Sequence, residues 1–324
     1  MESSTKIEFK PSYLELYENG ELAKRIKKLE KILYSCELCP RKCGIDRTRG
    51  EKGVCNSGKE LMVSSYNPHY GEEIELVGNR ILAMYGRGGS GTIFLTNCNL
   101  LCVFCQNYDI SHLGHGKKRS KTEVADFMIK LQNVNGCHNI NFVTPTHFAP
   151  QLIKATEFAI KKGLRIPIVW NCGGYENVEV IKLLKGIVDI YMPDIKYGIN
   201  ESSEKYSKVP APEYFERCKE SIKEMHHQVG DLKINDKGIA QKGLLIRHLV
   251  MPGNIAGSKE VLDFIAKEIS KDSFVNIMSQ YRPSGKVHKY PELNLYPSQN
   301  EFRRVVKLAE DLDLTRGLQS KHII

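Results

Sequence analysis

Apolar positions along this chain follow two spacings, which alternate from about residue 90 onward. Short continuous apolar runs are typical of buried strands, and apolar positions three and four residues apart are typical of helices. The pattern predicts six strand–helix units. The predicted strands are 91–96, 139–143, 166–170, 188–192, 244–250 and 274–278. The predicted helices are 124–131, 152–160, 178–184, 215–225, 261–269 and 302–312.

Repeated strand–helix units with apolar strands indicate an α/β protein with a parallel sheet, which is either curled into a barrel or doubly wound. In both architectures, function lies at the carboxyl ends of the strands. The segments after the predicted strands are polar or rich in Gly and Pro, which agrees with this expectation. They are 98–105, 144–147, 171–174, 193–196, 252–253 and 280–282. Periodicity alone leaves the choice between barrel and doubly wound sheet open.

The segment before residue 90 differs in kind. The basic run 24–31 carries apolar residues at helical spacing, so its lysines are expected on the solvated face of an amphipathic helix. Two short strands are predicted at 60–65 and 80–84. His69 lies in the turn-like segment between them and is typical of a turn residue more than of a metal ligand.

Four cysteines in the N-terminal segment have the spacing of a metal site. Their pattern, C-x2-C-x3-C-x11-C, is a strong signal for metal ligation. Both a closed four-thiolate zinc site and a second iron–sulfur cluster fit this pattern. The four residues are Cys36, Cys39, Cys43 and Cys55.

Three more cysteines, Cys98, Cys102 and Cys105, lie on one loop directly after the first predicted strand. Their spacing, C-x3-C-x2-C, supplies three ligands, whereas a 4Fe–4S cluster normally takes four. One iron would keep an open coordination position, which is where metal sites perform chemistry. Half of a zinc site and inert buried thiols are the alternatives. The spacing also differs from that of ferredoxins, which transfer electrons.

Composition and charge narrow the class of protein. The chain has 324 residues, of which 41% are hydrophobic and 26% charged, as in one larger globular domain with a small appendage. Its net charge of +9 is spread along the sequence, so nucleic-acid binding is not expected. Residues 1–12 and the apolar run 243–251 resemble neither a signal peptide nor a membrane span. We expect a cytoplasmic protein whose cysteines stay reduced, and ten cysteines in such a chain favour metal ligation over disulfides.

The cysteine loop, together with residues 89–94 before it and Gln106 and Asn107 after it, resembles the signature of the radical S-adenosylmethionine (SAM) superfamily. The likeness is to the branch related to pyruvate formate-lyase activating enzymes. It implies a partial (βα)6 barrel over residues 86–324, preceded by a small Cys-rich extension over residues 1–85. It also implies a 4Fe–4S cluster on Cys98, Cys102 and Cys105, bound SAM, and a reductant such as flavodoxin or ferredoxin in an anaerobic cell. Reductive cleavage of SAM would then release a 5′-deoxyadenosyl radical that abstracts hydrogen.

The resemblance also implies cofactor-binding residues. Asp194 and Lys196 match the fourth-strand motif of the activating enzymes, and Arg247 matches their fifth-strand arginine. Two departures from the pattern concern the loops after the second and third strands. Thr144 and Thr146 stand where those enzymes have a Gly-Gly-Glu motif that receives the amino group of SAM. Asn171 replaces an aspartate of that family, so the charged ligand there becomes neutral.

The substrate is where the sequence says least, because fold and cofactor do not fix function. A protein or peptide substrate is the first expectation, and radical modification of RNA or of a small molecule is the alternative within the class. Outside the class, the rival is a non-catalytic iron–sulfur or zinc protein that transfers electrons. That rival leaves the polar segments after six strands unexplained.

Overall fold

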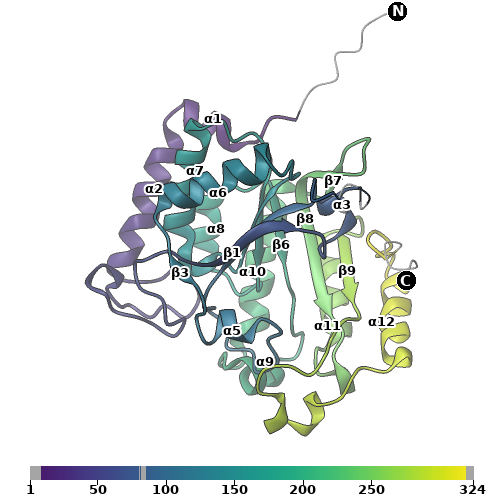
Figure 1. The fold of residues 1–324 in the computed structure, drawn as a ribbon. Helices are drawn as coiled ribbons and strands as arrows, with labels where there is room; N and C mark the ends of the chain where they lie inside the picture. Colours follow the sequence, from purple (N-terminus) through teal and green to yellow (C-terminus); the bar gives the residue numbers. More distant parts are fainter. Residues whose placement is uncertain (1–8, 80, 82–84, 319–324) are drawn as a thin grey trace, which may run out of the picture.

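The structure is a computed structural model that describes residues 9–79, 81 and 85–318. Its centre is a sheet with six parallel strands (Figure 1). Each strand pairs with the next along the chain, without the reversal of order that a doubly wound sheet requires. The parallel strands are β2 (Ser90–Leu95), β4 (Ile140–Val143), β5 (Ile168–Cys172), β6 (Ile190–Pro193), β8 (Ala240–Leu249) and β9 (Phe274–Met278).

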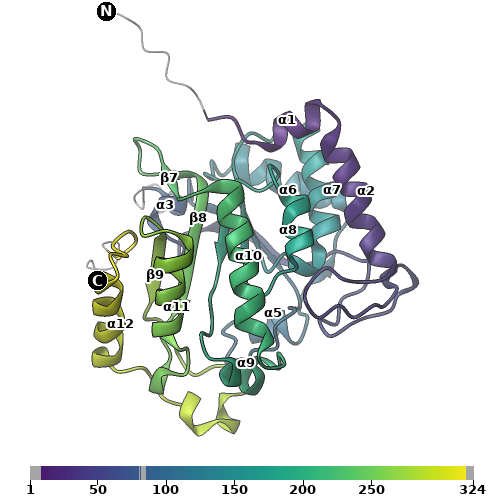
Figure 2. The same ribbon diagram turned by 180° about the vertical axis from the view of Figure 1, so that it is seen from behind.

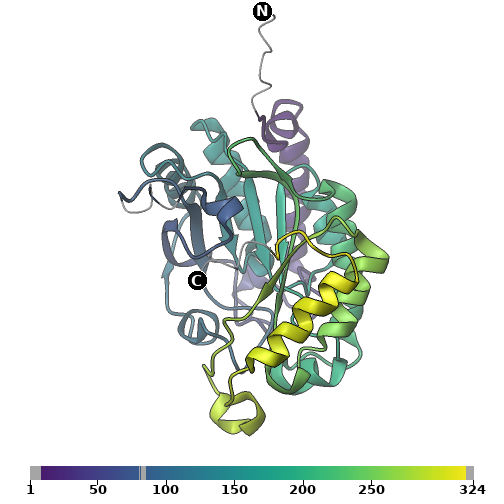
Figure 3. The same cartoon turned by 90° about the vertical axis from the view of Figure 1, so that its right-hand side faces the viewer.

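Helices cover the outer face of this sheet (Figure 2). Two of them, α6 and α12, are preceded by the N-cap residues Ser120 and Ser298, each of which forms a capping box with the glutamate three residues later. Figure 3 shows α12 beside α11, at the edge that β9 forms. The covering helices are α6 (Lys121–Asn133), α7 (Ala149–Lys161), α8 (Val178–Leu184), α10 (Glu213–Val229), α11 (Ser258–Phe264) and α12 (Gln299–Asp311).

The observed elements confirm the six strand–helix units predicted from periodicity, with bounds shifted by a few residues. The sequential strand order also decides for the partial barrel over the doubly wound sheet. The fold is therefore an α/β partial barrel with an N-terminal region that carries cysteines. None of the described helices combines the length and the apolar character that crossing a bilayer requires.

The N-terminal region packs directly onto the barrel. Helix α1 (Tyr13–Glu18) is followed by α2 (Glu21–Lys31), which packs against α7 and α8. Helix α2 buries Leu22, Ile26 and Leu29 and leaves its lysines outside, which confirms the amphipathic helix. Strand β1 (Met62–His69) pairs antiparallel with β2 and so extends the sheet.

Strand β1 covers the strand predicted at 60–65 and continues to His69. The strand predicted at 80–84 lies outside the described residues except for Ile81. The predicted boundary between an extension and a barrel at residue 85 stays a prediction. The remaining short elements are α3 (Ile74–Val77), α5 (Tyr108–Ser111), β3 (Lys117–Lys118), α9 (Asn200–Ser207) and β7 (Lys233–Ile234), with 3-10 turns at Ile32–Tyr34, Arg47–Arg49, Thr146–Phe148, Pro252–Asn254, Val287–Lys289 and Pro291–Leu293 and a π-turn at Ile265–Ile269.

The sheet has an apolar cluster on each of its two faces, because successive side chains of a strand point to opposite faces. One cluster packs under the covering helices, and the other lies inside the barrel. The inner cluster contains Val169, Ile190 and Leu245 together with Leu76 of α3. Further along the same strands toward their carboxyl ends, the inner positions change to polar residues such as Asn171 and Arg247. Apolar side chains therefore fill one end of the barrel interior, and polar side chains line the other end, where a reaction site is expected.

Candidate functional site

The loop after β2 carries the three cysteines Cys98, Cys102 and Cys105. The chain turns out of the strand at Asn97, which takes a positive φ of 66°. Asparagine tolerates this left-handed conformation better than most residues. The backbone of the loop is then held by bonds to a distant segment, since the Val103 N–H donates to the Tyr206 carbonyl at 2.8 Å.

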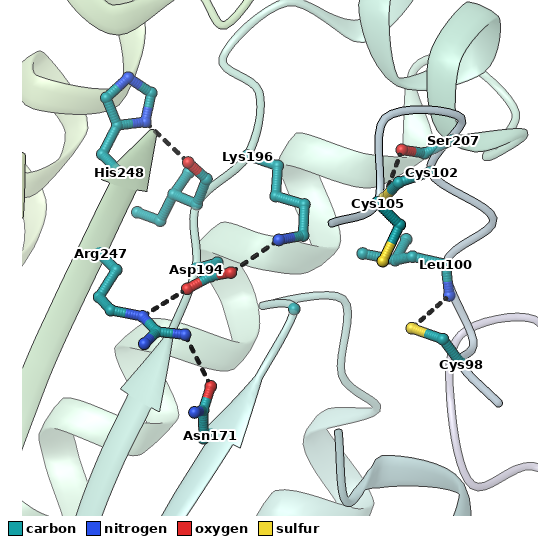
Figure 4. Close-up of polar contacts among 12 residues, drawn as sticks. Cys98, Leu100, Cys102, Cys105, Asn171, Asp194, Lys196, Ser207, Arg247 and His248 are labelled. Atoms are coloured by element: carbon teal, nitrogen blue, oxygen red, sulfur yellow. Dashed lines mark hydrogen bonds and ion pairs between the residues drawn. The ribbon is translucent and has the colours of Figure 1, made fainter. Parts of the chain in front are cut away.

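Each of the three sulfur atoms accepts a hydrogen bond, and Figure 4 shows the bonds to Cys98 and Cys102. The Leu100 N–H donates to Cys98 Sγ at 3.4 Å, and the Ser207 hydroxyl donates to Cys102 Sγ at 2.9 Å. The Ser111 hydroxyl donates to Cys105 Sγ at 3.1 Å. Hydrogen bonds to sulfur stabilise the thiolate form and tune iron–sulfur clusters.

Burial opposes ionisation of these thiols. It raises the pKa of Cys98 above its usual range, and it raises the pKa of Cys102 to about 11 although the nearby Lys196 ammonium lowers it. As free thiols, Cys98 and Cys102 are therefore protonated at neutral pH, and metal binding must displace their protons.

The arrangement of the sulfurs fits a cluster of several irons. Nowhere in the described part of the chain do three Cys, His, Asp or Glu side chains converge closely enough to hold one metal ion. In a 4Fe–4S cluster each cysteine ligates a different iron, so the sulfurs stay apart. Three hydrogen-bonded sulfurs on one loop are therefore compatible with a cluster.

A network of charged side chains lies beside this loop, at the carboxyl ends of neighbouring strands. Asp194 follows β6 and forms a bridge with Arg247 of β8. Its carboxylate accepts from Arg247 Nε at 2.7 Å and from Lys196 Nζ at 2.7 Å. Arg247 Nη2 also donates to Asn171 Oδ1 of β5 at 2.8 Å. Figure 4 shows Lys196 between Asp194 and the three cysteines.

The charged side chains of this network keep one another ionised. Burial would raise the pKa of Asp194, but Arg247 and Lys196 lower it to about 2. Burial would lower the pKa of Lys196, but Asp194 raises it above its usual range. A fixed carboxylate thus holds two cations at the edge of the cysteine loop, which is where an anionic group of a ligand would be attracted.

Glu72 and Glu73 belong to the same end of the barrel and were missed from the sequence. Glu72 Oε2 accepts from Arg247 Nη1 at 3.1 Å, and its other oxygen lies 3.3 Å from Nδ1 of His69, which ends β1. Glu73 accepts from the Asn276 amide of β9. The run Gly-Glu-Glu from residue 71 was the available signal, but it precedes the predicted barrel. Only the pairing of distant strands brings it to the site.

The two threonines predicted to receive SAM have different positions. Thr144 follows β4 with a φ of 59°, and its N–H donates to the Asn171 carbonyl at 2.8 Å. The Thr146 hydroxyl donates to Glu176 at 2.6 Å. Burial raises the pKa of Glu176 to about 8. Thr144 therefore neighbours the charged network, whereas Thr146 has a hydrogen-bond partner of its own, and roles for both in SAM binding stay predictions.

The four upstream cysteines, Cys36, Cys39, Cys43 and Cys55, come together around one small cavity, whose wall also includes Arg47 and His147. Backbone turns bring them there. The Cys36 N–H donates to the Ile45 carbonyl at 2.9 Å, and the Gly44 N–H donates back to the Cys36 carbonyl at 3.1 Å. The structure thus gathers the four cysteines at one cavity, and their role as metal ligands stays a prediction.

Known proteins similar to this chain agree with the geometry. The profile of the Radical SAM superfamily matches residues 92–265. An uncharacterized protein of Methanocaldococcus jannaschii is 35% identical over 94% of this chain and 80% of its own length. A second protein of that organism, named provisionally as a glycyl-radical enzyme activating enzyme, is 24% identical over 70% of this chain and 87% of its own length.

A solved structure, native anSMEcpe with bound AdoMet, is 16% identical with a TM-score of 0.46 and covers 67% of this chain. The chain spans 57% of that protein, which is less than two thirds of its length. The family match covers more than half of this chain and includes the cysteine loop and Asp194. The chain therefore belongs to the radical SAM superfamily, whose enzymes cleave SAM with the help of a 4Fe–4S cluster.

Proposed function

We propose that this protein is an activating-enzyme-like radical SAM enzyme that acts on a protein or peptide. Cys98, Cys102 and Cys105 hold the 4Fe–4S cluster in this proposal. The observation that carries it is the position of Lys196, which lies between the Asp194 carboxylate and the cysteine loop. When bound, the cluster would pass an electron from a reductant to SAM, and SAM would supply the hydrogen-abstracting radical. The protein itself binds, orients and shields.

Lys196 and Arg247 are the cations suited to the SAM carboxylate, because charge-assisted hydrogen bonds are the strong ones. Asp194 holds both in place through bonds of 2.7 Å, and Asn171 fixes the other side of the guanidinium at 2.8 Å. The chain therefore presents a rigid group whose charges are already paired in the absence of ligand. Little reorganisation is needed when an anionic group arrives.

The inner face of the barrel supports a polar substrate. Asn141 of β4 is fully buried, and neither its amide nitrogen nor its amide oxygen has a hydrogen-bond partner among the described residues. The same holds for one oxygen of Asn276 and one of Glu73. Buried polar atoms are almost always satisfied, so these are suited to a ligand that offers both donors and acceptors. A peptide backbone offers both.

The relative named provisionally as a glycyl-radical enzyme activating enzyme supports a protein substrate as well. The activating-enzyme-like motif around residues 189–196 points the same way. The four-Cys segment ahead of the barrel sets this chain apart from activating enzymes that carry extra clusters after the cysteine loop. We therefore propose radical chemistry on a protein or peptide without assigning a glycyl radical as its product.

Transfer of deuterium tests the substrate class. Cells are grown in deuterated medium, and their protein, RNA and small-molecule fractions are incubated anaerobically with the reconstituted enzyme, unlabelled SAM and dithionite. Because the radical abstracts hydrogen from its substrate, deuterium should enter 5′-deoxyadenosine only with the protein fraction. Enrichment with the RNA or small-molecule fraction instead would refute a protein or peptide substrate.

A further inference from the structure

The upstream segment of Cys36, Cys39, Cys43 and Cys55, here called the four-Cys segment, contains a cation that has no anionic partner. Arg47 is fully buried in the wall of the cavity that the four thiols line. Its Nε donates to the Gly58 carbonyl at 3.0 Å, and its Nη1 donates to the His147 carbonyl at 2.7 Å. Among the described ion pairs none involves Arg47, yet its Nη1 lies 4.0 Å from Cys36 Sγ.

A buried guanidinium without a counter-charge is costly. Protonated thiols do not provide that charge, but metal-bound cysteines are thiolates. Arg47 is thus placed to compensate four thiolates that carry a metal centre. This observation is independent of the cysteine spacing.

Close packing around the thiols also agrees with a built site. A Cβ atom on Gly53 would lie 2.7 Å from Cys43 Sγ, so a glycine at this position lets the stretches around residues 43 and 53 approach closely. Among the described residues no three metal-ligating side chains form a ready site for a single ion. We take this to favour a cluster of several irons over one zinc ion.

The four-Cys segment touches the loop of Cys98, Cys102 and Cys105, here called the SAM-cluster loop, through Arg41. This residue lies between Cys39 and Cys43. Its Nε donates to the Asn99 carbonyl of the SAM-cluster loop at 3.2 Å. Its Nη2 donates to the carbonyl of Ser207 at 3.3 Å, and the hydroxyl of the same serine donates to Cys102 Sγ.

Two further contacts reach the start of the SAM-cluster loop. Asn97 Nδ2 donates to Ser57 Oγ at 3.1 Å, and that hydroxyl donates to the Cys55 carbonyl at 3.2 Å. His147, whose carbonyl accepts from Arg47, also lies 2.8 Å through its Nε2 from the Thr96 carbonyl. Three separate contacts therefore join the segment to the start of the loop, and the bond from Arg41 to Ser207 reaches Cys102 indirectly.

We propose that Cys36, Cys39, Cys43 and Cys55 hold a second iron–sulfur cluster and that the loaded segment clamps the SAM-cluster loop in its binding geometry. Arg41, Ser57 and Arg47 are the positioning residues of the clamp. The clamp rests on the proposed function of Cys98, Cys102 and Cys105, whereas the second cluster does not. The four-Cys segment closes its coordination sphere with its own ligands, so its role is support and not reaction.

Metal analysis of a variant with Cys98, Cys102 and Cys105 replaced by Ala tests the second cluster. After anaerobic reconstitution with iron and sulfide, we expect about four irons per chain, against about eight in the wild type. One zinc or no metal in the variant would overturn the second cluster. Eight irons in the variant would instead show that the ligands assigned under the proposed function are wrong, so the two failures are distinguishable.

Hydrogen–deuterium exchange of the peptide that spans residues 97–107 tests the clamp. Arg41→Ala keeps every cysteine, and we expect it to accelerate exchange in this peptide several-fold while iron content stays at the wild-type value. Arg49→Ala is the matched control, because Arg49 lies on the same segment with its side chain 81% exposed. Ser57→Ala, which removes a smaller contact, serves if Arg41→Ala does not fold. Wild-type exchange in a folded variant would overturn the clamp.

Discussion

Two cysteine-rich segments meet in this protein, and their surroundings differ more than their ligands do. The SAM-cluster loop has three cysteines and faces the paired charges of Asp194, Lys196 and Arg247. The four-Cys segment has four cysteines around a cavity and faces the single buried cation Arg47. Three cysteines leave room for a further ligand on the metal, and the charged side chains beside them can bind that ligand. Four cysteines leave no such room, so the single cation beside them can only compensate the charge of the thiolates. The surroundings and the number of ligands thus indicate a reaction site at the SAM-cluster loop and a structural site at the four-Cys segment.

The largest effect should come from removing one ligand of the SAM-cluster loop. We expect Cys102→Ala to reduce formation of 5′-deoxyadenosine from SAM and dithionite to background, because the cluster loses a ligand and with it the electron for SAM cleavage. Cys137→Ala is the control, since this buried thiol belongs to neither segment and its Sγ donates to the Gly88 carbonyl at 3.4 Å. Equal formation of 5′-deoxyadenosine by both variants would show that Cys102 is no more important for the reaction than a buried thiol outside the loop.

A substitution at Arg47 tests the role given to the four-Cys segment. With the four-Cys segment loaded, Arg47→Met should lower the free energy of unfolding by about 3–5 kcal/mol, because the thiolates lose their buried counter-charge. In metal-free protein the same change should be nearly neutral, since a buried cation without an anion is itself costly. Denaturant unfolding under anaerobic conditions, with and without reconstitution, measures both values. A loss of equal size in both states would contradict the role given to Arg47.

The charged network should control SAM affinity and not cluster content. We expect Lys196→Ala to keep the iron of the wild type and to weaken SAM binding by about 1.5–3 kcal/mol, the size of one charge-assisted hydrogen bond. Lys223→Ala is the matched control, because Lys223 pairs with Glu268 on the outer helices. Equilibrium binding by calorimetry checks both. If Lys196→Ala binds SAM as tightly as the wild type does, the charged network does not bind SAM.

A smaller, pH-dependent effect is expected at Glu176, which lies behind Thr146. Burial raises the pKa of this carboxyl from 4.5 to about 8 in the folded protein. The folded state therefore binds a proton that the unfolded state has already lost between about pH 5 and pH 8, and stability falls as pH rises through this window. The decrease from pH 6 to pH 8 should be on the order of 2 kcal/mol. Glu176→Gln should flatten this slope in thermal or denaturant unfolding, and an unchanged slope would mean that Glu176 ionises normally.

Much of this comparison could be predicted from local sequence. Periodicity was enough for the six strand–helix units, since each depends on residues close in the chain. The cysteine spacings identified both segments, and the motif around Asp194 and Lys196 identified the charged network with Arg247. These features are local, or they are short motifs that follow a strand.

What escaped prediction depends on contacts between distant residues. Glu72 reaches Arg247 only because β1 pairs with β2 and places its end over the barrel. The partner of Thr146 proved to be Glu176, and Arg47 is buried although its sequence context is polar. Strand order, which decided between a barrel and a doubly wound sheet, also follows from long-range pairing. Such contacts have no signature in hydrophobic spacing.

Mössbauer spectroscopy of protein reconstituted with 57Fe tests the central claim most directly, because it reports all irons at once. In the proposed arrangement, one iron of the cluster on the SAM-cluster loop keeps an open coordination position, whereas the cluster of the four-Cys segment has none. Adding SAM should therefore change the spectrum of one iron site of the first cluster and leave the second cluster, about half of the total iron, unchanged. A spectrum that SAM does not alter, or one in which both clusters respond, would contradict the division between a reacting and a supporting segment.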